Sequence, residues 1–211
     1  MPQSVSPAFL KRLSNVFSLR VQNYGDTPAG VLWKDIYGQQ LRFEVLVNIL
    51  NDVPASNSIT LSDIGCGYGA FFDFLSAQPK IPQFTYAGYD ISTDMVNRTL
   101  ARIKGSRGTC IVSDRSLRPV DYTFVSGTYN LRLDIDDNDW NSYVKTSLSQ
   151  LWEMTDQGLA FNMLDKNHRN RLDGLYYADS NDFMDYCSRL SPNITLINDY
   201  PLDEWTLFIR R

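Results

Sequence analysis

The sequence predicts a single α/β domain of the doubly wound type, with a seven-stranded, mostly parallel sheet and a helical cap at the N-terminus. Three observations support this prediction. Strand-like apolar runs alternate with helix-like segments along most of the chain. A glycine-rich turn joins the first of these strands to its helix. The connection between the last two strands is too short for a parallel crossover, so we expect them to form an antiparallel hairpin.

The length and composition fit this architecture. A chain of 211 residues is long enough to bury a good-sized core, and its 43% hydrophobic and 21% charged residues are ordinary for a globular domain. We assign residues 1–211 to one domain, with a helical cap over 1–52 and a core over 58–211. The net charge of −4 indicates no basic surface, so we expect no nucleic-acid partner.

The sequence also bears on where the protein acts. The N-terminal segment 1–12 contains no apolar signal core, and no apolar run approaches the length of a membrane span. The three cysteines, Cys66, Cys110 and Cys187, form no close pair in the sequence and are expected to be reduced. We therefore expect a cytoplasmic protein with no membrane partner.

Two helices are predicted in the cap. Ser6 offers a capping hydroxyl and Pro7 occupies the first helical position, and an apolar stripe continues from there to Val21. The segment 23–30 is rich in turn-forming residues and is expected to be a loop. The second helical stretch carries Trp33, Tyr37, Arg42 and Phe43.

The predicted core alternates strands and helices. The expected strands are 59–64, 84–89, 109–112, 121–125 and 159–164, followed by the hairpin strands 193–200 and 205–210. The expected helices are 68–77, a segment opened by Ser92 and ended by Gly105, a segment from Trp140 to Leu151, and a segment from Phe183 to Leu190.

The turn between the first strand and its helix carries the chemistry. The glycines at 65, 67 and 69 permit positive φ angles and let the backbone approach a ligand closely. The N–H groups at the start of the next helix face such a ligand with partial positive charge. Asp63, at the strand end, can accept a hydrogen bond from a cationic amine. The next strand ends at Asp90, where an acidic residue can bind both hydroxyls of a ribose. This pattern predicts a nucleoside-binding βαβ unit.

The glycine spacing alone leaves more than one reading open. The run from Gly65 to Ala70 also satisfies the dinucleotide fingerprint, so an NAD(P)-binding oxidoreductase is an alternative. No tyrosine is followed by a lysine four residues later, as the dyad of short-chain dehydrogenases requires. A non-catalytic binding module with a degenerate cofactor site is a further alternative, although the intact glycines, Asp63 and Asp90 argue against decay.

The run from Asp63 to Gly69, Asp-Ile-Gly-Cys-Gly-Tyr-Gly, resembles motif I of the class I S-adenosylmethionine (SAM) dependent methyltransferases. The further matching segments are 89–91, 112–114, 122–127 and the terminal hairpin, so the resemblance extends from the second helix to the C-terminus. Five βα units closed by an antiparallel hairpin is also the order of elements in this Rossmann-like family.

The resemblance implies a role for each matching position. Gly65, Gly67 and Gly69, with Cys66 between them, would lie under the methionine and ribose parts of SAM. Asp63 would contact the methionyl amine, and Asp90 would hold the ribose hydroxyls.

The adenine and the reacting end of SAM would meet other residues. Ile91 would pack on the adenine, and Asp114 would accept a hydrogen bond from its amino group. The segment from Ser126 and Gly127 to Tyr129 would face the sulfonium and the acceptor. Arg42, in the cap, is a candidate for the carboxylate of SAM.

Methyl transfer is an in-line displacement that converts SAM to S-adenosyl-L-homocysteine (SAH). It mainly requires alignment and exclusion of water, and a general base is needed only for a protonated acceptor. His168, the one histidine, follows the fifth strand and is a candidate base, although a solvated loop histidine is the alternative. Tyr129 is a candidate for cation–π or hydrogen-bond contact with the sulfonium, or else a core aromatic residue.

No metal is expected. The acidic run from Asp134 to Asp139 resembles a calcium loop at first, but Asp139 stands where glycine is required and Lys145 where a glutamate is required. No histidine or cysteine cluster has zinc spacing either. The acidic net charge favours a small-molecule acceptor, such as a metabolite, sugar or natural product.

Overall fold

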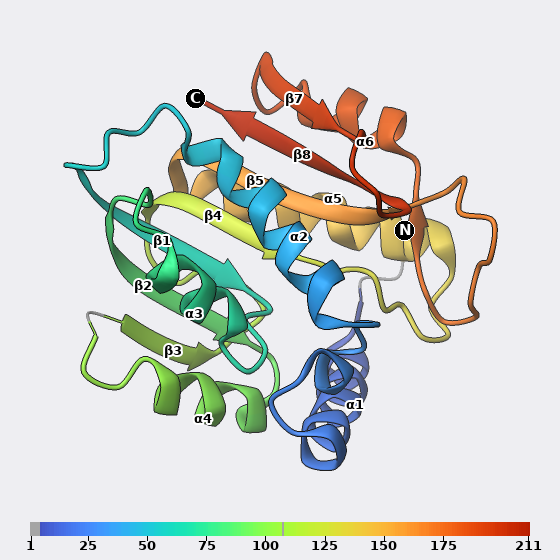
Figure 1. Cartoon of the computed structure of the whole chain (residues 1–211). Coiled ribbons are helices and arrows are strands. Elements are labelled where there is room, and N and C mark those ends of the chain that lie inside the picture. The colour runs from blue at the N-terminus through green and yellow to red at the C-terminus, as the bar shows by residue number, and fades with distance from the viewer. Residues whose placement is uncertain (1–4, 107) are drawn as a thin grey trace.

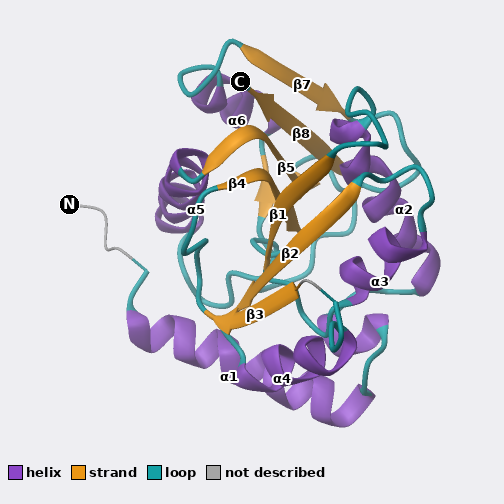
Figure 2. Ribbon diagram, turned by 90° about the vertical axis from the view of Figure 1, so that its left-hand side faces the viewer, coloured by secondary structure: helices purple, strands orange, loops and turns teal. Residues whose placement is uncertain are grey.

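The computed structural model describes residues 5–106 and 108–211 and shows one mixed sheet with helices on both faces (Figures 1 and 2). Seven strands form a continuous path in the order β3-β2-β1-β4-β5-β8-β7, and the short β6 pairs with β5. The strands are β1 (Ser58–Ile64), β2 (Gln83–Asp90), β3 (Gly108–Val112), β4 (Val120–Ser126), β5 (Thr155–Asp165), β6 (Tyr177–Ala178), β7 (Asn193–Ile197) and β8 (Glu204–Arg210).

The direction of the strands confirms the predicted architecture. The pairs β1–β2, β1–β4, β2–β3 and β4–β5 are parallel, which brings their carboxyl ends to one edge of the sheet. β8 runs antiparallel to both β5 and β7, so the last two strands form the predicted hairpin. The sheet has one strand more than predicted, because the loop after β5 adds β6.

The helices cover the two faces and one edge of the sheet. They are α1 (Pro7–Tyr24), α2 (Ile36–Val47), α3 (Ala70–Ala77), α4 (Thr93–Arg102), α5 (Asp137–Glu153) and α6 (Ser180–Cys187), with 3-10 turns η1 (Pro28–Val31) and η2 (Asn48–Leu50). Figure 2 shows α5 and α6 on one side of the sheet and α2 and α3 on the other. Two separate buried clusters fill these layers, one built with α5 and α6 and one with α2, α3 and α4.

Local signals explain where the cap helices begin. Ser6 accepts a hydrogen bond from the backbone N–H of Phe9 at 3.2 Å, with Pro7 at the first helical position, as predicted for α1. α2 begins at Ile36 because Asp35 caps it through a 2.7 Å bond from the N–H of Gly38. Trp33 was predicted on this helix and instead lies before it, just after Leu32, whose φ of +63° interrupts helical geometry.

The cap covers the carboxyl edge of the parallel strands. α1 packs mainly against η1 and α4, and its residues Phe9 and Leu13 belong to the same cluster as α5 and α6. The structure thereby leaves a space between α1, η1 and the ends of β1, β2 and β4. None of the helices in the described ranges combines the length and the apolar character needed to cross a bilayer.

Candidate functional site

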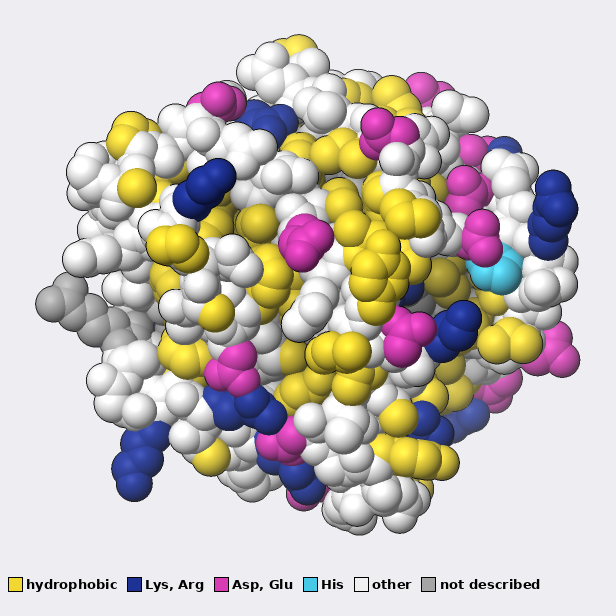
Figure 3. All heavy atoms as spheres, in the orientation of Figure 1, with side chains coloured by type: hydrophobic (Ala, Val, Ile, Leu, Met, Phe, Trp, Pro, Cys, Tyr) yellow, Lys and Arg dark blue, Asp and Glu magenta, His cyan; other side chains and the backbone are white. Residues whose placement is uncertain are grey.

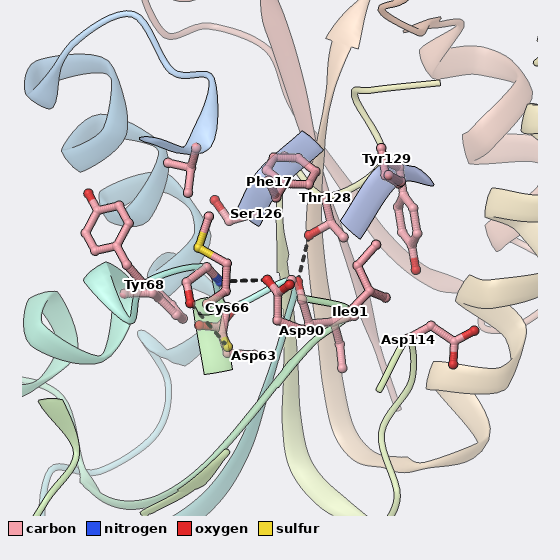
Figure 4. Close-up of a pocket in the computed structure, with 18 of the residues that line it drawn as sticks. Phe17, Asp63, Cys66, Tyr68, Asp90, Ile91, Asp114, Ser126, Thr128 and Tyr129 are labelled. Atoms are coloured by element: carbon pink, nitrogen blue, oxygen red, sulfur yellow. Dashed lines mark hydrogen bonds between the residues drawn. The ribbon is translucent and has the colours of Figure 1, made fainter. Parts of the chain in front are cut away.

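A cavity lies where the carboxyl ends of β1, β2 and β4 meet the cap (Figure 4). Its empty volume is about 940 Å³, which includes the part that opens to solvent. Ligands of open α/β sheets bind at this edge, next to the point where the strand order reverses. Here that point lies between β1 and β4, since the chain proceeds from β1 to β2 and β3 on one side and then crosses to β4.

The glycine turn after β1 forms the floor of the cavity. Gly65, Gly67 and Gly69 have φ angles of +71°, +56° and +87°, in the left-handed region that favours glycine. A Cβ atom at Gly65 would lie 2.4 Å from Oγ1 of Thr128, which itself donates a 2.6 Å hydrogen bond to the carbonyl of Ile64. Position 65 therefore has neither the backbone angle nor the space for a side chain.

Residues of the cap contact this turn directly. A Cβ atom at Gly67 would lie 3.1 Å from Cγ1 of Val31 in η1. Tyr68, the next residue, donates a 2.9 Å hydrogen bond from its hydroxyl to Oε1 of Gln39 in α2. Gly69 caps α3 without a side-chain partner, and it supports the turn from outside the cavity lining.

Asp90, at the end of β2, is a buried carboxylate that organises the turn. Its Oδ2 accepts from the backbone N–H of Gly67 at 3.0 Å (Figure 4). Its Oδ1 accepts from the N–H of Ser92 at 2.8 Å. Burial raises the pKa of Asp90 to about 6, and the bonds from these backbone N–H groups oppose the rise. The predicted residue thus faces the cavity and is also bonded to the glycine turn.

Asp63 lies close by and is 2% exposed. The Tyr86 hydroxyl donates a 2.7 Å hydrogen bond to its Oδ2. Burial, together with the neighbouring Asp90, raises the pKa of Asp63 to about 7, although the Tyr86 bond opposes the rise. No lysine or arginine is among the residues that line the cavity, so both carboxylates lack a cationic partner within the described lining.

The far end of the cavity combines apolar and polar side chains. Ile91, Asp114, Tyr129 and Tyr143 line it, next to Leu10 and Leu13 of α1. The Tyr129 hydroxyl is buried without a hydrogen-bond partner among the described residues, as is the Ser126 hydroxyl at the end of β4. Burial raises the pKa of Tyr129 far above its usual range and that of Tyr143 to about 12, so both hydroxyls stay protonated near neutral pH.

The structure thus gathers most of the predicted residues at one place. Those that line the cavity are Asp63, Gly65, Cys66, Gly67, Asp90, Ile91, Asp114, Ser126, Gly127 and Tyr129. Their roles toward SAM remain predictions.

Two predicted residues lie away from the cavity. Arg42 pairs with Glu204 of β8 and stacks over Trp33 instead of pointing into the cavity. His168 lies in the loop after β5, where Nδ1 accepts from the N–H of Asn170 at 3.0 Å and Nε2 is 3.5 Å from Oδ2 of Asp203. Neither residue belongs to the cavity lining.

The sequence analysis missed part of the wall. Phe17 and Val31 of the cap line the cavity, although Phe17 was recognised only as part of an apolar stripe. Thr128 was included in a predicted segment, but its contact with Gly65 had no sequence signal. Asn162 and Glu204 lie behind the wall, each 3% exposed or less. For Asn162 the available signal was a polar residue within a predicted strand, whereas Glu204 was predicted in the connection before the last strand and had no such signal.

The charged groups on the molecular surface follow no single sign. On the face drawn in Figure 3, lysine and arginine side chains are interspersed with aspartate and glutamate. Among residues 5–106 and 108–211, no three histidine, cysteine, aspartate or glutamate side chains group as metal ligands would.

Comparison with known proteins places the chain among enzymes. No family model matches it. A protein of Mycobacterium tuberculosis (strain ATCC 25618 / H37Rv), named "Putative methyltransferase Rv1506c", is 34% identical over 163 residues, which cover 75% of this chain and 97% of that protein.

Solved structures share the fold. Magnesium protoporphyrin IX methyltransferase (ChlM) from Synechocystis PCC 6803 with bound SAH has a TM-score of 0.68 at 15% identity, covering 96% of this chain and 99% of that one. The DhpI–SAH complex has a TM-score of 0.65 at 9% identity, covering 97% and 98%. The M. tuberculosis protein is matched over 97% of its length, and the sheet order and the glycine turn agree with the solved methyltransferases. The chain therefore belongs to the class I SAM-dependent methyltransferases.

Proposed function

We propose that the chain transfers a methyl group from SAM to a small-molecule acceptor within the cavity at the carboxyl edge. The observation that carries the proposal is the joining of the glycine turn, Asp63 and Asp90 in one buried wall with no cation opposite them. A positively charged ligand with hydroxyl groups complements such a wall.

The wall fits SAM in shape as well as in charge. Gly65 and Gly67 have no side chains, so the turn presents bare backbone to the cavity, and Thr128 and Val31 occupy the spaces where Cβ atoms would lie. We infer that Gly65, Cys66 and Gly67 lie under the methionine and ribose, with Gly69 supporting the turn. Asp63 would bind the amine, and the free lone pairs of Asp90 would accept from the ribose hydroxyls.

The other end of the cavity suits a purine. Ile91 offers an apolar surface, and Asp114 offers an acceptor for an exocyclic amine. The buried Ser126 and Tyr129 hydroxyls, which lack partners among the described residues, are free to donate to a ligand. A buried polar group without a partner is costly, so binding a ligand that satisfies it recovers that cost.

The chemistry follows from alignment more than from proton transfer. When bound, SAM supplies a methyl group on a positively charged sulfur, which the acceptor takes as the carbon–sulfur bond breaks. The protein orients both partners and excludes water with Phe17, Val31 and Trp33. Tyr129 acts as a hydrogen-bond donor and not as a base, since burial keeps its hydroxyl protonated. His168, bonded to its own loop and outside the lining, takes no part in this proposal.

The cap side of the cavity indicates the class of acceptor. Trp33, Phe43 and Phe17 give it an aromatic wall, and no lysine or arginine of the described lining is available to bind an anion. A small, neutral or weakly charged organic molecule suits this wall. The fold neighbours include a magnesium protoporphyrin IX methyltransferase and a phosphoethanolamine N-methyltransferase, which supports a small-molecule acceptor without defining its size or charge.

Calorimetric titration with SAM, SAH and NAD tests the proposal. We expect saturable binding of SAM and SAH, no binding of NAD, and a loss of about tenfold or more in SAM affinity for Asp90→Ala, because the variant removes acceptors for both the ribose and Gly67. Glu44→Ala, at an exposed position of α2, is the matched control. Binding of NAD alone would favour the oxidoreductase alternative, and binding of none of the three would favour a non-catalytic module.

A further inference from the structure

A buried ion pair joins the cap to the C-terminal hairpin behind the cavity. Nε of Arg42, in α2, donates to Oε2 of Glu204 at 2.8 Å, and Nη2 pairs with the other carboxylate oxygen. The side chains of Arg42 and Glu204 are only 15% and 1% exposed. The planar guanidinium therefore binds the carboxylate in a bidentate manner. This geometry fixes the orientation of the Arg42 side chain in addition to balancing the charge.

The pair is connected to the turn that follows β4. The Asn162 side chain of β5 donates to Oε2 of Glu204 through its amide nitrogen. Its amide oxygen accepts from the backbone N–H of Gly127 at 2.8 Å. Gly127 comes directly after Ser126, and both line the cavity. An unbroken chain of hydrogen bonds therefore runs from α2 to the cavity wall.

Arg42 also reaches the same turn through Trp33. Its guanidinium carbon lies 4.3 Å from the centre of the Trp33 ring. The edge of that ring is 3.1 Å from where a Cβ atom at Gly127 would lie, and the φ of Gly127 is +65°. The indole thus packs on the bare backbone of the turn, and Arg42 fixes both the indole and the turn.

Stability alone gives a weak reason for this arrangement. Burying a charged pair costs desolvation, and apolar residues of similar volume are often as stabilising. None of Arg42, Asn162 and Glu204 is among the residues that line the cavity. We propose that these three are positioning residues, which hold Trp33 and the turn from Ser126 to Thr128 in the geometry that binds SAM. This inference rests on the proposed function of the cavity.

A double substitution separates positioning from charge balance. In Arg42→Met/Glu204→Gln no buried charge is left alone, so we expect thermal unfolding close to that of the wild type. The variant loses the bidentate contact between residues 42 and 204 and the stacking of the guanidinium on Trp33. We therefore expect SAH to bind about tenfold more weakly by calorimetry. We also expect a shifted Trp33 emission, isolated by subtracting the spectrum of the same protein with Trp33→Phe.

A matched control and a second variant sharpen the test. Asp26→Asn removes the ion pairs of the cap with Arg98 and Arg102, none of which lines the cavity, and should leave SAH affinity and Trp33 emission unchanged. Arg42→Lys keeps the charge but loses the planar fork, so it should fold and still bind SAH more weakly.

Wild-type SAH affinity and wild-type Trp33 emission in either Arg42 variant would overturn the inference. If the wild type itself bound no SAH, the proposed function would fall. In that case the emission of Trp33 still tests the positioning role without any ligand. An unchanged emission in Arg42→Lys would overturn that role too.

Discussion

Besides the exposed pair of Arg12 and Asp134, two groups of ion pairs attach the cap to the core, and they differ in their surroundings. The first, which we call the Arg42 anchor, is the buried pair of Arg42 and Glu204. The second, the Asp26 anchor, consists of Asp26 with Arg98 and Arg102 of α4, whose side chains are 26% to 34% exposed. Solvent screens the second group, whereas the first is held in a low dielectric and is bonded to Asn162.

This difference indicates which end of the cap is firmly fixed. Exposed ion pairs contribute about 0–1 kcal/mol, whereas removing one partner of a buried pair costs about 3–5 kcal/mol. The α2 end of the cap is therefore fixed to the core by a buried ion pair, whereas the end formed by α1 and η1 is held by apolar contacts, exposed ion pairs and single hydrogen bonds. We expect a ligand to enter past η1, with α2 as the fixed side.

The largest expected effect is that of Arg42→Ala, which removes the buried anchor. The variant leaves the Glu204 carboxylate 1% exposed and without its cation, so we expect it to lose about 3–5 kcal/mol in free energy of unfolding. Urea denaturation followed by circular dichroism measures this loss. Glu204→Ala is the partner control and should cost less, because the more exposed Arg42 can turn toward solvent. An Arg42→Ala loss below about 1 kcal/mol would remove the distinction between the anchors.

The next effect comes from buried carboxylates that lack a cation. Unlike the charges of the Arg42 anchor, the charge of such a carboxylate destabilises the folded protein. Burial raises the pKa of Asp63 from 3.8 to about 7, so between these values the folded protein keeps a proton that the unfolded chain has released. Stability without ligand should therefore fall as pH rises from about 4 to 7, by on the order of 2–4 kcal/mol, and then level off.

Chemical denaturation at intervals between pH 4.5 and 8 measures this slope, and Asp63→Asn should reduce it, leaving the part below about pH 6 that comes from Asp90. Asp26→Asn, at an exposed site, should keep the slope. SAM should raise the melting temperature more at pH 8 than at pH 5, because an ionised Asp63 attracts the amine. A slope unchanged in Asp63→Asn would assign the proton to another group.

The smallest effect is expected at the Asp26 anchor. Asp26→Asn should cost no more than about 1 kcal/mol at low salt, and the difference from the wild type should disappear near 1 M NaCl. The Arg42→Ala loss should persist at the same salt concentration. Urea denaturation at two ionic strengths makes both measurements, and equal salt dependence for the two variants would contradict the comparison.

The two anchors also mark the limit of what the sequence predicts. The turn from Asp63 to Gly69 and the strand end at Asp90 were recognisable because each depends on the local pattern of a strand and a turn. The contact between Arg42 and Glu204 joins residues that are 162 apart in the chain, and no local pattern pairs them. From the family resemblance, Arg42 was predicted to bind the carboxylate of SAM. The structure instead pairs it with Glu204 of β8.

Other differences have similar physical causes. His168 was placed correctly in the loop after β5, but the direction of its side chain depends on Asn170 and Asp203, which the sequence does not rank as partners. Trp33 was predicted on a helix from its apolar neighbours, whereas the left-handed backbone at Leu32 and the cap at Asp35 set the helix start. The antiparallel hairpin was predicted from the short connection between its strands, whereas the order of the strands in the sheet was not predicted.

The contact between Gly65 and Thr128 has a consequence for how this family of sequences can diverge. The threonine side chain fills the space that any other residue at 65 would need, and it bonds to the strand end beneath. A smaller residue at 128 would therefore relieve only the steric restriction at 65, because the φ of +71° would still favour glycine there. In a directed-evolution library, position 65 should therefore stay glycine in every active clone, whereas position 128 can be varied as long as the bond to the carbonyl of Ile64 is replaced.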